Sequence, residues 1–444
     1  MKICFIPIDN RPVCYDLVSD ICSIDKDIEL YIPPIEYLGS LKESAKIDKI
    51  YEWLEHLPEV DSIVIALDTI AYGGLIPSRR IKDTYEDIKI RLSRLKPILK
   101  GKKVYAFSSI MRISNNNYNE EEKEYWAEYG KKIFEYSYNL HKYGKADSSD
   151  IPDEILKDYL ETRNRNFEIN KIYLEWQKEG FFDTLVFSKD DCAEYGLNVK
   201  EAKELESIGG FTKTGADEIP LTLLARSIKK DIKVFVEFTE PDCTNLISNY
   251  EDVSIEKSVK GQLELGGFKE VNDIKQADIV LIVNNFREKQ GELVMGWETG
   301  SKYNGSFDLP DKPFAVADVR YANGADNFFV EELLKSLPAK NFLGYSGWNT
   351  SANTIGSLLA GVKVAFKAQK YNLNAFKKLQ LIRFLDDWAY QANVRSRIEM
   401  PCDIKDLMKP YAERFTAIFD YDVNYSNVTF TPPWNRKFEI EITI

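Results

Sequence analysis

Histidine is scarce in this chain, and its scarcity excludes several classes of enzyme. Only two histidines, His56 and His141, occur among 444 residues, and each lies in a segment with helical periodicity rather than after a predicted strand. A Ser-His-Asp or Cys-His catalytic arrangement would therefore lack a base. Zinc or iron sites built on histidine would lack ligands. If the protein is an enzyme, we expect carboxylates, arginine, lysine or tyrosine to handle its protons.

Paired cysteines, long apolar runs and excess positive charge are also missing. The six cysteines show no Cys-x-x-Cys spacing, which argues against a zinc ribbon or a disulfide framework and fits a reducing compartment. No window approaches about 18 uncharged apolar residues, and Asp9 and Arg11 come too early for a signal peptide. The net charge of −12 disfavours nucleic acid and anionic lipid. We predict a cytoplasmic protein that binds neither nucleic acid nor membrane.

What the chain does contain is an alternation of apolar runs with amphipathic helical segments. Near-continuous apolar strands separated by such helices are typical of parallel β/α units in an α/β protein. Nine strands fit a (β/α)8 (TIM)-like barrel with one strand added, which we favour, or two adjacent Rossmann-like sheets that divide near residue 230. The predicted strands are 3–8, 29–33, 62–67, 103–108, 184–188, 233–238, 278–283, 314–318 and 341–345.

Two segments interrupt the alternation. Residues 117–180 are polar, helical and rich in tyrosine and glutamate, and they form an insertion between the fourth and fifth strands. Their aromatic content fits a dimer interface or, more commonly, a satellite core. We predict a β/α domain over residues 1–365 and a C-terminal helical segment with a β tail over residues 366–444. Whether the protein is a homo-oligomer stays open.

Polar side chains follow almost every predicted strand, and both architectures place ligands at the carboxyl ends of strands. Asp, Asn and Gly after a strand usually form turns and helix caps, but caps do not require the arginines and aromatic residues found here. This combination suits a polyhydroxylated small molecule such as a sugar. The candidate substrate-binding residues are Asp9, Arg11, Asp68, Tyr72, Arg79, Arg112, Glu218, Asp318, Arg320, Asn323, Asp326, Trp348, Asn349 and Asn353.

Cofactor motifs are weak or absent. The chain has no G-x-x-x-x-G-K-[ST] segment, and "GYSGWNTSANTIG" lacks the G-x-G-x-x-G order, although it could present a helix N-terminus to an anion. Asp9, Asp68 or Asp318 could hold Mg²⁺ or Ca²⁺, but no spacing demands a metal. We therefore expect no cofactor and predict no metal site.

Several segments together resemble a known family. They are "PIDNRP", "LDTIAYGGLIPSR", "KDDCAEYGLN", "GADE", "GYSGWNTSANTIG" and "PPWNRKFEI". The chain resembles the bacterial domain-of-unknown-function 4127 family over nearly its whole length. The resemblance implies that the strand-end motifs belong to one architecture, and it implies no particular activity.

The strand over 184–188 ends at two adjacent aspartates, Asp190 and Asp191, which are the candidate catalytic residues. Neighbouring carboxylates in a partly buried site repel, so one keeps its proton and can act as a general acid. Glycoside hydrolysis uses this division of labour. By similarity of chemistry to hexosaminidases that use the substrate acetamide as nucleophile, Asp190 would hold the acetamide and Asp191 would protonate the leaving oxygen.

A structural interpretation competes with this one. Asp190 could cap the helix that begins near Asn198, or hold the turn with Lys189 neutralising it. A second pair, Asp386–Asp387, lies in a helical pattern and is interpreted as part of a solvated face.

The leading prediction is a glycoside hydrolase, with N-acetylated amino sugars as the favoured substrates. One alternative is a transferase or lyase that binds an anionic small molecule through Arg11, Arg79, Arg112 and Arg320. The other is a non-catalytic carbohydrate-binding protein.

Overall fold

The structure is a computed structural model that describes residues 1–400 and 403–444. The chain divides into two compact units, each of which draws on more than one stretch of sequence. The first unit contains Met1–Tyr15, Glu29–Leu223 and Tyr250–Asp252. The second contains Asp16–Ile28, Leu224–Asn249 and Val253–Ile444. Helix α10 (Ile219–Ser227) crosses the boundary between them.

The first unit is built on a six-stranded sheet in the order β2-β1-β3-β4-β5-β6, and every pairing in it is parallel. Chain order reverses between β1 and β3, which is the topological switch point of a doubly wound sheet. Its strands are β1 (Lys2–Ile6), β2 (Glu29–Tyr31), β3 (Ser62–Ala66), β4 (Val104–Ile110), β5 (Thr184–Lys189) and β6 (Thr212–Thr214).

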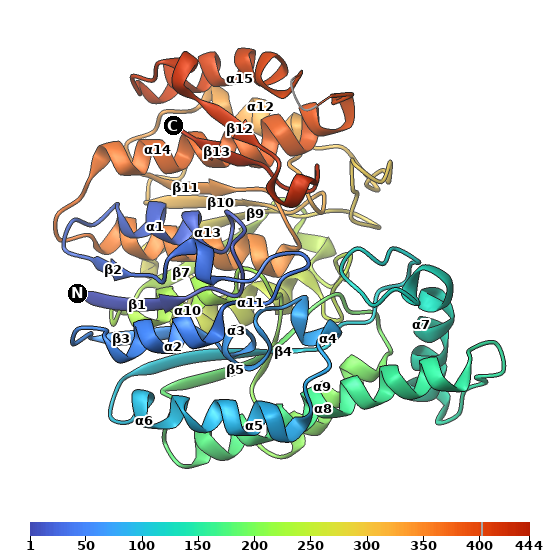
Figure 1. The fold of residues 1–444 in the computed structure, drawn as a ribbon. Helices are drawn as coiled ribbons and strands as arrows, with labels where there is room; N and C mark the ends of the chain where they lie inside the picture. The colour runs from blue at the N-terminus through green and yellow to red at the C-terminus, as the bar shows by residue number, and fades with distance from the viewer. Residues whose placement is uncertain (401–402) are drawn as a thin grey trace. The chain divides into compact units, whose positions relative to one another are not determined.

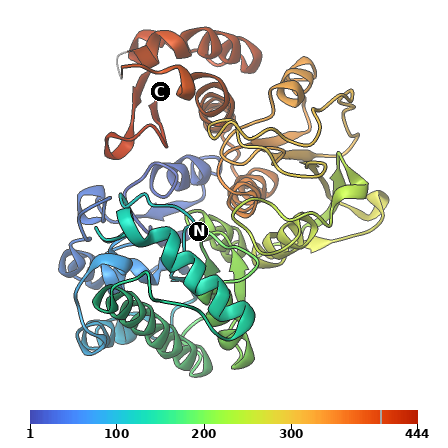
Figure 2. The same cartoon turned by 90° about the vertical axis from the view of Figure 1, so that its right-hand side faces the viewer.

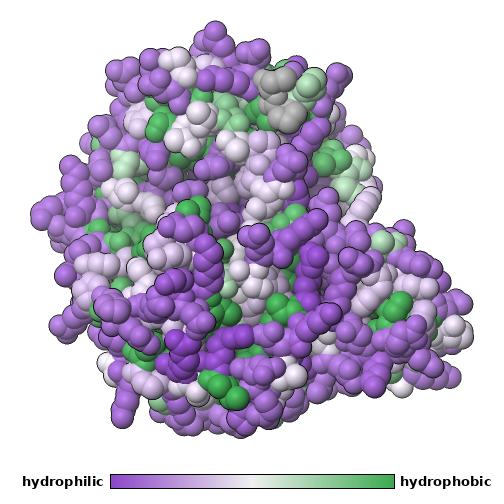
Figure 3. Space-filling model, in the orientation of Figure 1, coloured by the Kyte–Doolittle hydropathy of each residue, from purple (hydrophilic) through white to green (hydrophobic). Residues whose placement is uncertain are grey.

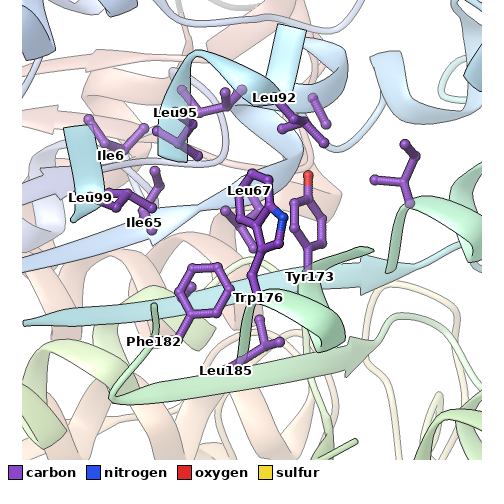
Figure 4. Packing of buried hydrophobic residues seen from close by; sticks show 14 of the residues in the cluster. Ile6, Ile65, Leu67, Leu92, Leu95, Leu99, Tyr173, Trp176, Phe182 and Leu185 are labelled. Carbon is purple, nitrogen blue, oxygen red and sulfur yellow. The ribbon is translucent and has the colours of Figure 1, made fainter. Parts of the chain in front are cut away.

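Helices cover this sheet and bury its apolar strands. Figure 4 shows the packing, with Ile65 of the central strand among aliphatic residues and with Trp176 near Tyr173 and Phe182. Burial of these side chains on both faces accounts for the near-continuous apolar strand sequences. The helices are α2 (Ile47–Glu55), α3 (Leu67–Tyr72), α4 (Pro77–Arg80), α5 (Tyr85–Ser93), α6 (Leu95–Leu99), α7 (Trp126–Tyr143), α8 (Asp153–Lys178) and α9 (Leu197–Ser207), with a 3-10 turn at η1 (Ile35–Tyr37).

The predicted insertion between the fourth and fifth strands is present as α7 and α8, which Figure 1 shows beside α9. A separate apolar cluster forms there around Trp126, Ile133 and Tyr159. The satellite-core interpretation of the aromatic residues is therefore confirmed. The segment that precedes α7 supplies two glutamates to the site described below.

The second unit contains a five-stranded parallel sheet in the order β11-β10-β9-β7-β8. Its strand order also reverses once, between β7 and β9, so both sheets are doubly wound. The strands are β7 (Lys233–Phe238), β8 (Lys269–Glu270), β9 (Ile279–Asn284), β10 (Phe314–Asp318) and β11 (Phe342–Ser346).

The remaining elements of the second unit are helices and a C-terminal hairpin. The hairpin pairs β12 (Thr429–Thr431) with β13 (Glu441–Thr443) and lies beside α15, as Figure 2 shows. The helices are α1 (Asp16–Cys22), α11 (Ile255–Leu265), α12 (Asn327–Lys335), α13 (Ser351–Lys367), α14 (Leu373–Arg383), a π-helix labelled η4 (Phe384–Val394) and α15 (Asp403–Phe419). Short 3-10 turns are η2 (Pro241–Cys243), η3 (Ile274–Gln276), η5 (Arg395–Arg397), η6 (Tyr425–Asn427) and η7 (Pro433–Asn435).

The favoured barrel is wrong, and the alternative of two sheets is the one that the structure supports. Within the described residues there is no closed barrel, because each parallel sheet has two edge strands. All nine predicted strands are present, whereas β6 and β8 were not predicted; they have three and two residues. The expected boundary after residue 365 lies inside the second unit, and the division considered near residue 230 lies close to Leu223–Leu224.

Two further features bear on the sequence predictions. Asp387 is fully buried in the π-helix and accepts a hydrogen bond from the Gly347 backbone N–H at 2.6 Å, so the solvated-face interpretation is wrong for it. Among the described residues, no helix is long and apolar enough to cross a membrane. The face of the molecule in Figure 3 is mainly hydrophilic, with apolar residues scattered in small groups.

Candidate active site

The candidate site lies where β4 and β5 of the first unit end side by side. These strands pair in parallel through to Ile110 and Lys189, so the segments that follow them lie at the same edge of the sheet. Arg112 and Ser114 follow β4, and Asp190 and Asp191 follow β5. Residues almost 80 positions apart in sequence are thereby brought into contact.

Arg112 is surrounded by carboxylates. It donates hydrogen bonds to Glu121 at 2.8 Å, to Glu122 at 2.9 Å and to Asp191 at 3.2 Å. Its Nη1 atom also lies 3.9 Å from Oδ2 of Asp190, beyond hydrogen-bond distance. Burial alone would lower the pKa of Arg112, but the surrounding carboxylates outweigh it and hold the pKa well above its usual range.

Arg79 of α4 points into the same acidic cluster. Its side chain is 2% exposed and lies 3.4 Å from Glu122, 3.6 Å from Glu121 and 3.7 Å from Asp190. None of its three guanidinium nitrogens makes a hydrogen bond within the described part of the chain. Arg79 is therefore held among these acids by charge attraction and not by hydrogen bonds with described residues.

The two aspartates have different surroundings. Asp191 accepts hydrogen bonds from Arg112 and, at 3.4 Å, from Ser114, whereas Oδ2 of Asp190 is buried and accepts none from the described residues. Burial, and next the repulsion of Asp191, raise the pKa of Asp190 to about 7. Burial also raises the pKa of Asp191, while Arg112 opposes this rise.

The backbone at Asp191 is unusual. Its φ of 35° lies in the left-handed region, which residues other than glycine seldom adopt. Such conformations persist where surrounding contacts impose them, and they cluster at functional sites. Here the Asn198 side chain donates to the Asp191 carbonyl at 3.2 Å, and the Cys192 N–H donates to the Tyr250 carbonyl at 2.9 Å.

The competing structural interpretation of Asp190 does not match these contacts. Lys189 is paired with Asp252 at 2.6 and 2.7 Å rather than with Asp190. Helix α9 begins at Leu197, whose N–H donates to the Ser137 hydroxyl at 2.8 Å. Asp190 is therefore neither the cap of that helix nor the partner of its lysine neighbour.

Asp68 and Tyr72 lie in α3, directly after the central strand β3. Asp68 is almost fully buried, and its Oδ2 accepts the Ser109 N–H at 2.8 Å while its Oδ1 makes no hydrogen bond with a described residue. Burial raises the pKa of Asp68 to about 7, and Arg79 is among the groups that oppose this rise. The buried hydroxyl of Tyr72 also makes no hydrogen bond with a described residue.

Three other predicted residues lie in the first unit. Asp9 and Arg11, after β1, form a pair at 2.7 Å, and Asp217 completes it at 2.5 Å from Arg11. Arg11 is thus already neutralised by two acids. Glu218 precedes α10, and its side chain is fully buried.

In the second unit, Asp318 belongs to a hydrogen-bonded network at the end of β10. Its Oδ1 accepts from Asn284 at 2.8 Å, and its Oδ2 accepts from the Asp326 N–H at 2.8 Å and the Tyr345 hydroxyl at 3.2 Å. Burial, and next the repulsion of Asp326, raise the pKa of Asp318 to about 8. Because both oxygens are satisfied, this network resembles a structural brace.

Arg320 extends the same network. It is fully buried, donates to Glu240 at 3.0 Å and lies 3.2 Å from Asp326. The other predicted residues of this unit lie near the start of α13. The Asn323 backbone N–H donates to the Asn349 carbonyl at 3.2 Å, and the Asn353 side chain donates to the Asn349 side chain at 3.2 Å. Trp348 is buried beside them.

The structure therefore places the predicted residues on two sheets rather than on one rim. Arg79, Arg112, Asp190 and Asp191 form one cluster, and Asp318, Arg320 and Asp326 form another. Glu121 and Glu122 were not predicted, because the acidic run "NEEEKEYW" looks like an ordinary solvated segment. Among the described residues, no three His, Cys, Asp or Glu side chains are arranged to hold a metal ion.

The fold and the site define an α/β protein with two doubly wound parallel sheets and a carboxylate–arginine cluster at one sheet edge. A family model described as "Protein of unknown function (DUF4127)" matches residues 3–443, and the chain belongs to this family. No curated protein matches the chain. Among solved structures, a UGT transferase from Siraitia grosvenorii in complex with UDP matches at 10% identity and a TM-score of 0.23, with 94% of this chain and 99% of that chain covered. So low a TM-score supports no inference about fold or activity.

Proposed function

We propose that the protein is a glycoside hydrolase whose reaction takes place at Asp190 and Asp191. The observation that carries the proposal is the asymmetry of the pair. Oδ2 of Asp190 is buried and makes no hydrogen bond with a described residue, whereas Asp191 accepts a hydrogen bond from Arg112. Two carboxyl groups that differ in this way supply a proton donor and a negative charge in one site.

The contacts support a division of roles opposite to the one expected from the sequence. Asp190, with its pKa raised to about 7, is the better general acid, and Asp191 is the better carboxylate. In the reaction, the Asp190 proton goes to the glycosidic oxygen as the bond from that oxygen to the anomeric carbon breaks. With an N-acetylated sugar, the acetamide oxygen attacks that carbon while Asp191 accepts the acetamide N–H. Water then opens this intermediate and returns a proton to Asp190.

The charge of the cluster favours a neutral substrate over an anionic one. Four carboxyl groups, Glu121, Glu122, Asp190 and Asp191, surround two guanidinium groups, Arg79 and Arg112. This surplus of negative charge would stabilise an oxocarbenium-like transition state and repel a carboxylate or phosphate. The alternative of an arginine clamp for an anion is less well supported, because Arg11 and Arg320 are paired with acids as well.

The test is hydrolysis of two series of glycosides, including N-acetylhexosaminides, that differ in their leaving groups. Aryl groups such as 2,4-dinitrophenol leave without protonation, whereas alkyl alcohols require an acid. We expect Asp190→Asn to lower kcat/KM on alkyl glycosides by about 100-fold or more and to affect dinitrophenyl glycosides much less. Asp191→Asn should impair both series. Asp150→Asn, at an exposed aspartate, is the control. Absence of hydrolysis across both series, or an Asp190→Asn variant that hydrolyses alkyl glycosides at the wild-type rate, would contradict the proposal.

A further inference from the structure

A second polar site lies in the second unit, between the end of β11 and the start of α13. The connection, residues 347–350, turns sharply at Asn349, whose φ is 79°. Helix α13 is 17 residues long, has no acidic residue in its first turn and has no side-chain cap at Thr350. The partial positive charge of such a helix end is left without a protein carboxylate in that turn.

The Asn349 side chain lies across this helix end. Its Oδ1 accepts the Thr350 N–H at 2.7 Å and the Asn353 side-chain N–H at 3.2 Å, which fixes the orientation of the carboxamide. The residue is 6% exposed, and its Nδ2 makes no hydrogen bond within the described part of the chain. A donor group is thus buried at the helix N-terminus without a hydrogen bond to any described residue.

A second donor lies next to it in the sequence. Trp348 is 1% exposed, and its indole Nε1 makes no hydrogen bond with any described residue. Its ring packs edge-on against Phe438, with ring centroids 5.7 Å apart. The guanidinium groups of Arg395 and Arg436 lie 5.1 and 5.7 Å from the centre of the same Phe438 ring.

Two carboxylates of this region each accept a hydrogen bond from a neighbouring residue. Asp387 accepts the Gly347 N–H at 2.6 Å, and Glu292 accepts from the Asn323 side chain at 3.0 Å. Oδ1 of Asp387 makes no hydrogen bond with a described residue, and neither the Trp348 indole N–H nor the Asn349 Nδ2 group donates to either carboxylate. Two buried N–H donors at a helix N-terminus together suit a group with several negatively charged oxygens.

We propose that the β11–α13 connection binds the phosphate group of a small molecule, with Asn349 Nδ2 and Trp348 Nε1 as donors. This site goes beyond the glycoside hydrolase proposed for the first unit and does not depend on it. It also goes beyond the expectation that the chain takes no cofactor. The phosphate belongs either to inorganic phosphate or to a phosphate ester or diphosphate, and the experiment distinguishes these sources.

The test is isothermal titration calorimetry of the full chain with inorganic phosphate, inorganic pyrophosphate, glucose 1-phosphate and two nucleoside diphosphates with different bases. Asn349→Asp keeps the oxygen that accepts from Thr350 and replaces the donor with a negatively charged oxygen. We expect it to weaken binding at least about tenfold. Trp348→Phe keeps an aromatic ring for packing against Phe438 and removes only the donor, and should weaken binding about fivefold. If Asn349→Asp does not fold, Trp348→Phe still tests the proposal.

Asp150→Asn, at an exposed aspartate of the other unit, is the control and should bind the phosphate compound as the wild type does. Binding of inorganic phosphate alone would identify a free-phosphate site, and tighter binding of one ester or diphosphate would identify that class. The proposal is overturned if none of the probes binds at 10 mM, or if both variants bind as tightly as the wild type. Either result leaves the glycoside hydrolase proposal untouched, because that proposal is tested by turnover.

Discussion

Arg112 and Asp191 form an ion pair across the ends of two neighbouring strands, with Nη1 of the arginine 3.2 Å from Oδ2 of the aspartate. The same nitrogen lies 3.9 Å from Asp190 and makes no hydrogen bond to it. The guanidinium therefore stabilises ionised Asp191 more than ionised Asp190. When the two carboxyl groups hold one proton between them, that proton resides mainly on Asp190.

The first prediction is a pH dependence of turnover. The proposed mechanism uses Asp190 in its protonated form, so kcat/KM on alkyl glycosides should fall as the pH rises through about 7. At lower pH, turnover should fall when Asp191 takes up a proton. For dinitrophenyl glycosides, kcat/KM should not fall as the pH rises through about 7, because the dinitrophenolate group leaves without an acid. A profile for alkyl glycosides that stays flat to pH 9 would show that no group with the raised pKa of Asp190 donates the proton.

The second prediction concerns the buried Asp68. Its pKa is raised from 3.8 to about 7 in the folded chain, so between these values the native state binds more protons than the unfolded state. The free energy of unfolding therefore decreases as the pH rises through this window. Below about pH 4, Asp68 is protonated in both states and does not reduce the stability. Asp68→Asn removes this dependence and keeps an oxygen for the Ser109 N–H.

Relative to the wild type, the Asp68→Asn variant should gain roughly 2 to 4 kcal/mol in free energy of unfolding between pH 5 and pH 8. Urea unfolding of both proteins at the two pH values measures this difference. If the two proteins differ in free energy of unfolding by the same amount at pH 5 and at pH 8, Asp68 has the same pKa in the folded and unfolded chains.

The local structure was predictable from the sequence, whereas the pairing of the strands was not. Apolar strand sequences such as Ser62–Ala66 predict burial on both faces of the sheet, and the amphipathic segments predict helices. A closed barrel and an open doubly wound sheet use the same β/α unit, so the pattern does not distinguish them. The reversals between β1 and β3 and between β7 and β9 depend on which strands pair, and that is decided by contacts distant in sequence.

The candidate site was predictable only in part for the same reason. Asp190, Asp191 and Arg112 lie immediately after strands, where ligands of α/β proteins bind. Glu121 and Glu122 belong to the insertion, and nothing in their local sequence distinguishes them from solvated glutamates. The burial of Asp387 was missed because an α-helical sequence pattern gives no sign of a π-helix packed against α14, α15 and β11.

The third prediction concerns the turn between α3 and α4. Gly73 has a φ of 89°, and a Cβ atom there would lie 2.6 Å from the Ser44 Cβ and 2.8 Å from the Ala45 nitrogen. Gly101 has a similar φ of 77°, but a Cβ atom there would meet nothing within 4 Å. Alanine at either position bears the strain of left-handed backbone, roughly 1 kcal/mol, and only alanine at 73 adds a clash.

We therefore expect Gly101→Ala to lower the free energy of unfolding by roughly 1 kcal/mol and Gly73→Ala to lower it by several times as much. Urea unfolding monitored by circular dichroism compares the two variants. Equal losses would mean that the backbone near Ser44 relaxes without cost.

The fourth prediction concerns the buried pair of Lys189 and Asp252, whose lysine directly precedes the two aspartates proposed as catalytic. Lys189 Nζ lies 2.6 and 2.7 Å from the two carboxylate oxygens of Asp252, and the side chains are 8% and 10% exposed. Asp252→Asn leaves the lysine charge buried without its partner, so we expect a loss of roughly 3–5 kcal/mol in free energy of unfolding. Glu52→Gln, which breaks an exposed pair with Lys49, is the matched control and should cost less than about 1 kcal/mol.

Lys189 of this pair is directly next to Asp190, so the pair could affect both stability and activity. A double variant separates the two effects. A Lys189→Met, Asp252→Leu double variant removes both charges and should regain most of the stability lost in Asp252→Asn. If the pair positions Asp190, the double variant should still have a reduced kcat on alkyl glycosides, with a smaller change in KM. Full recovery of kcat together with stability would mean that the pair only supports the fold, and that the aspartates are positioned by Arg79 and Arg112.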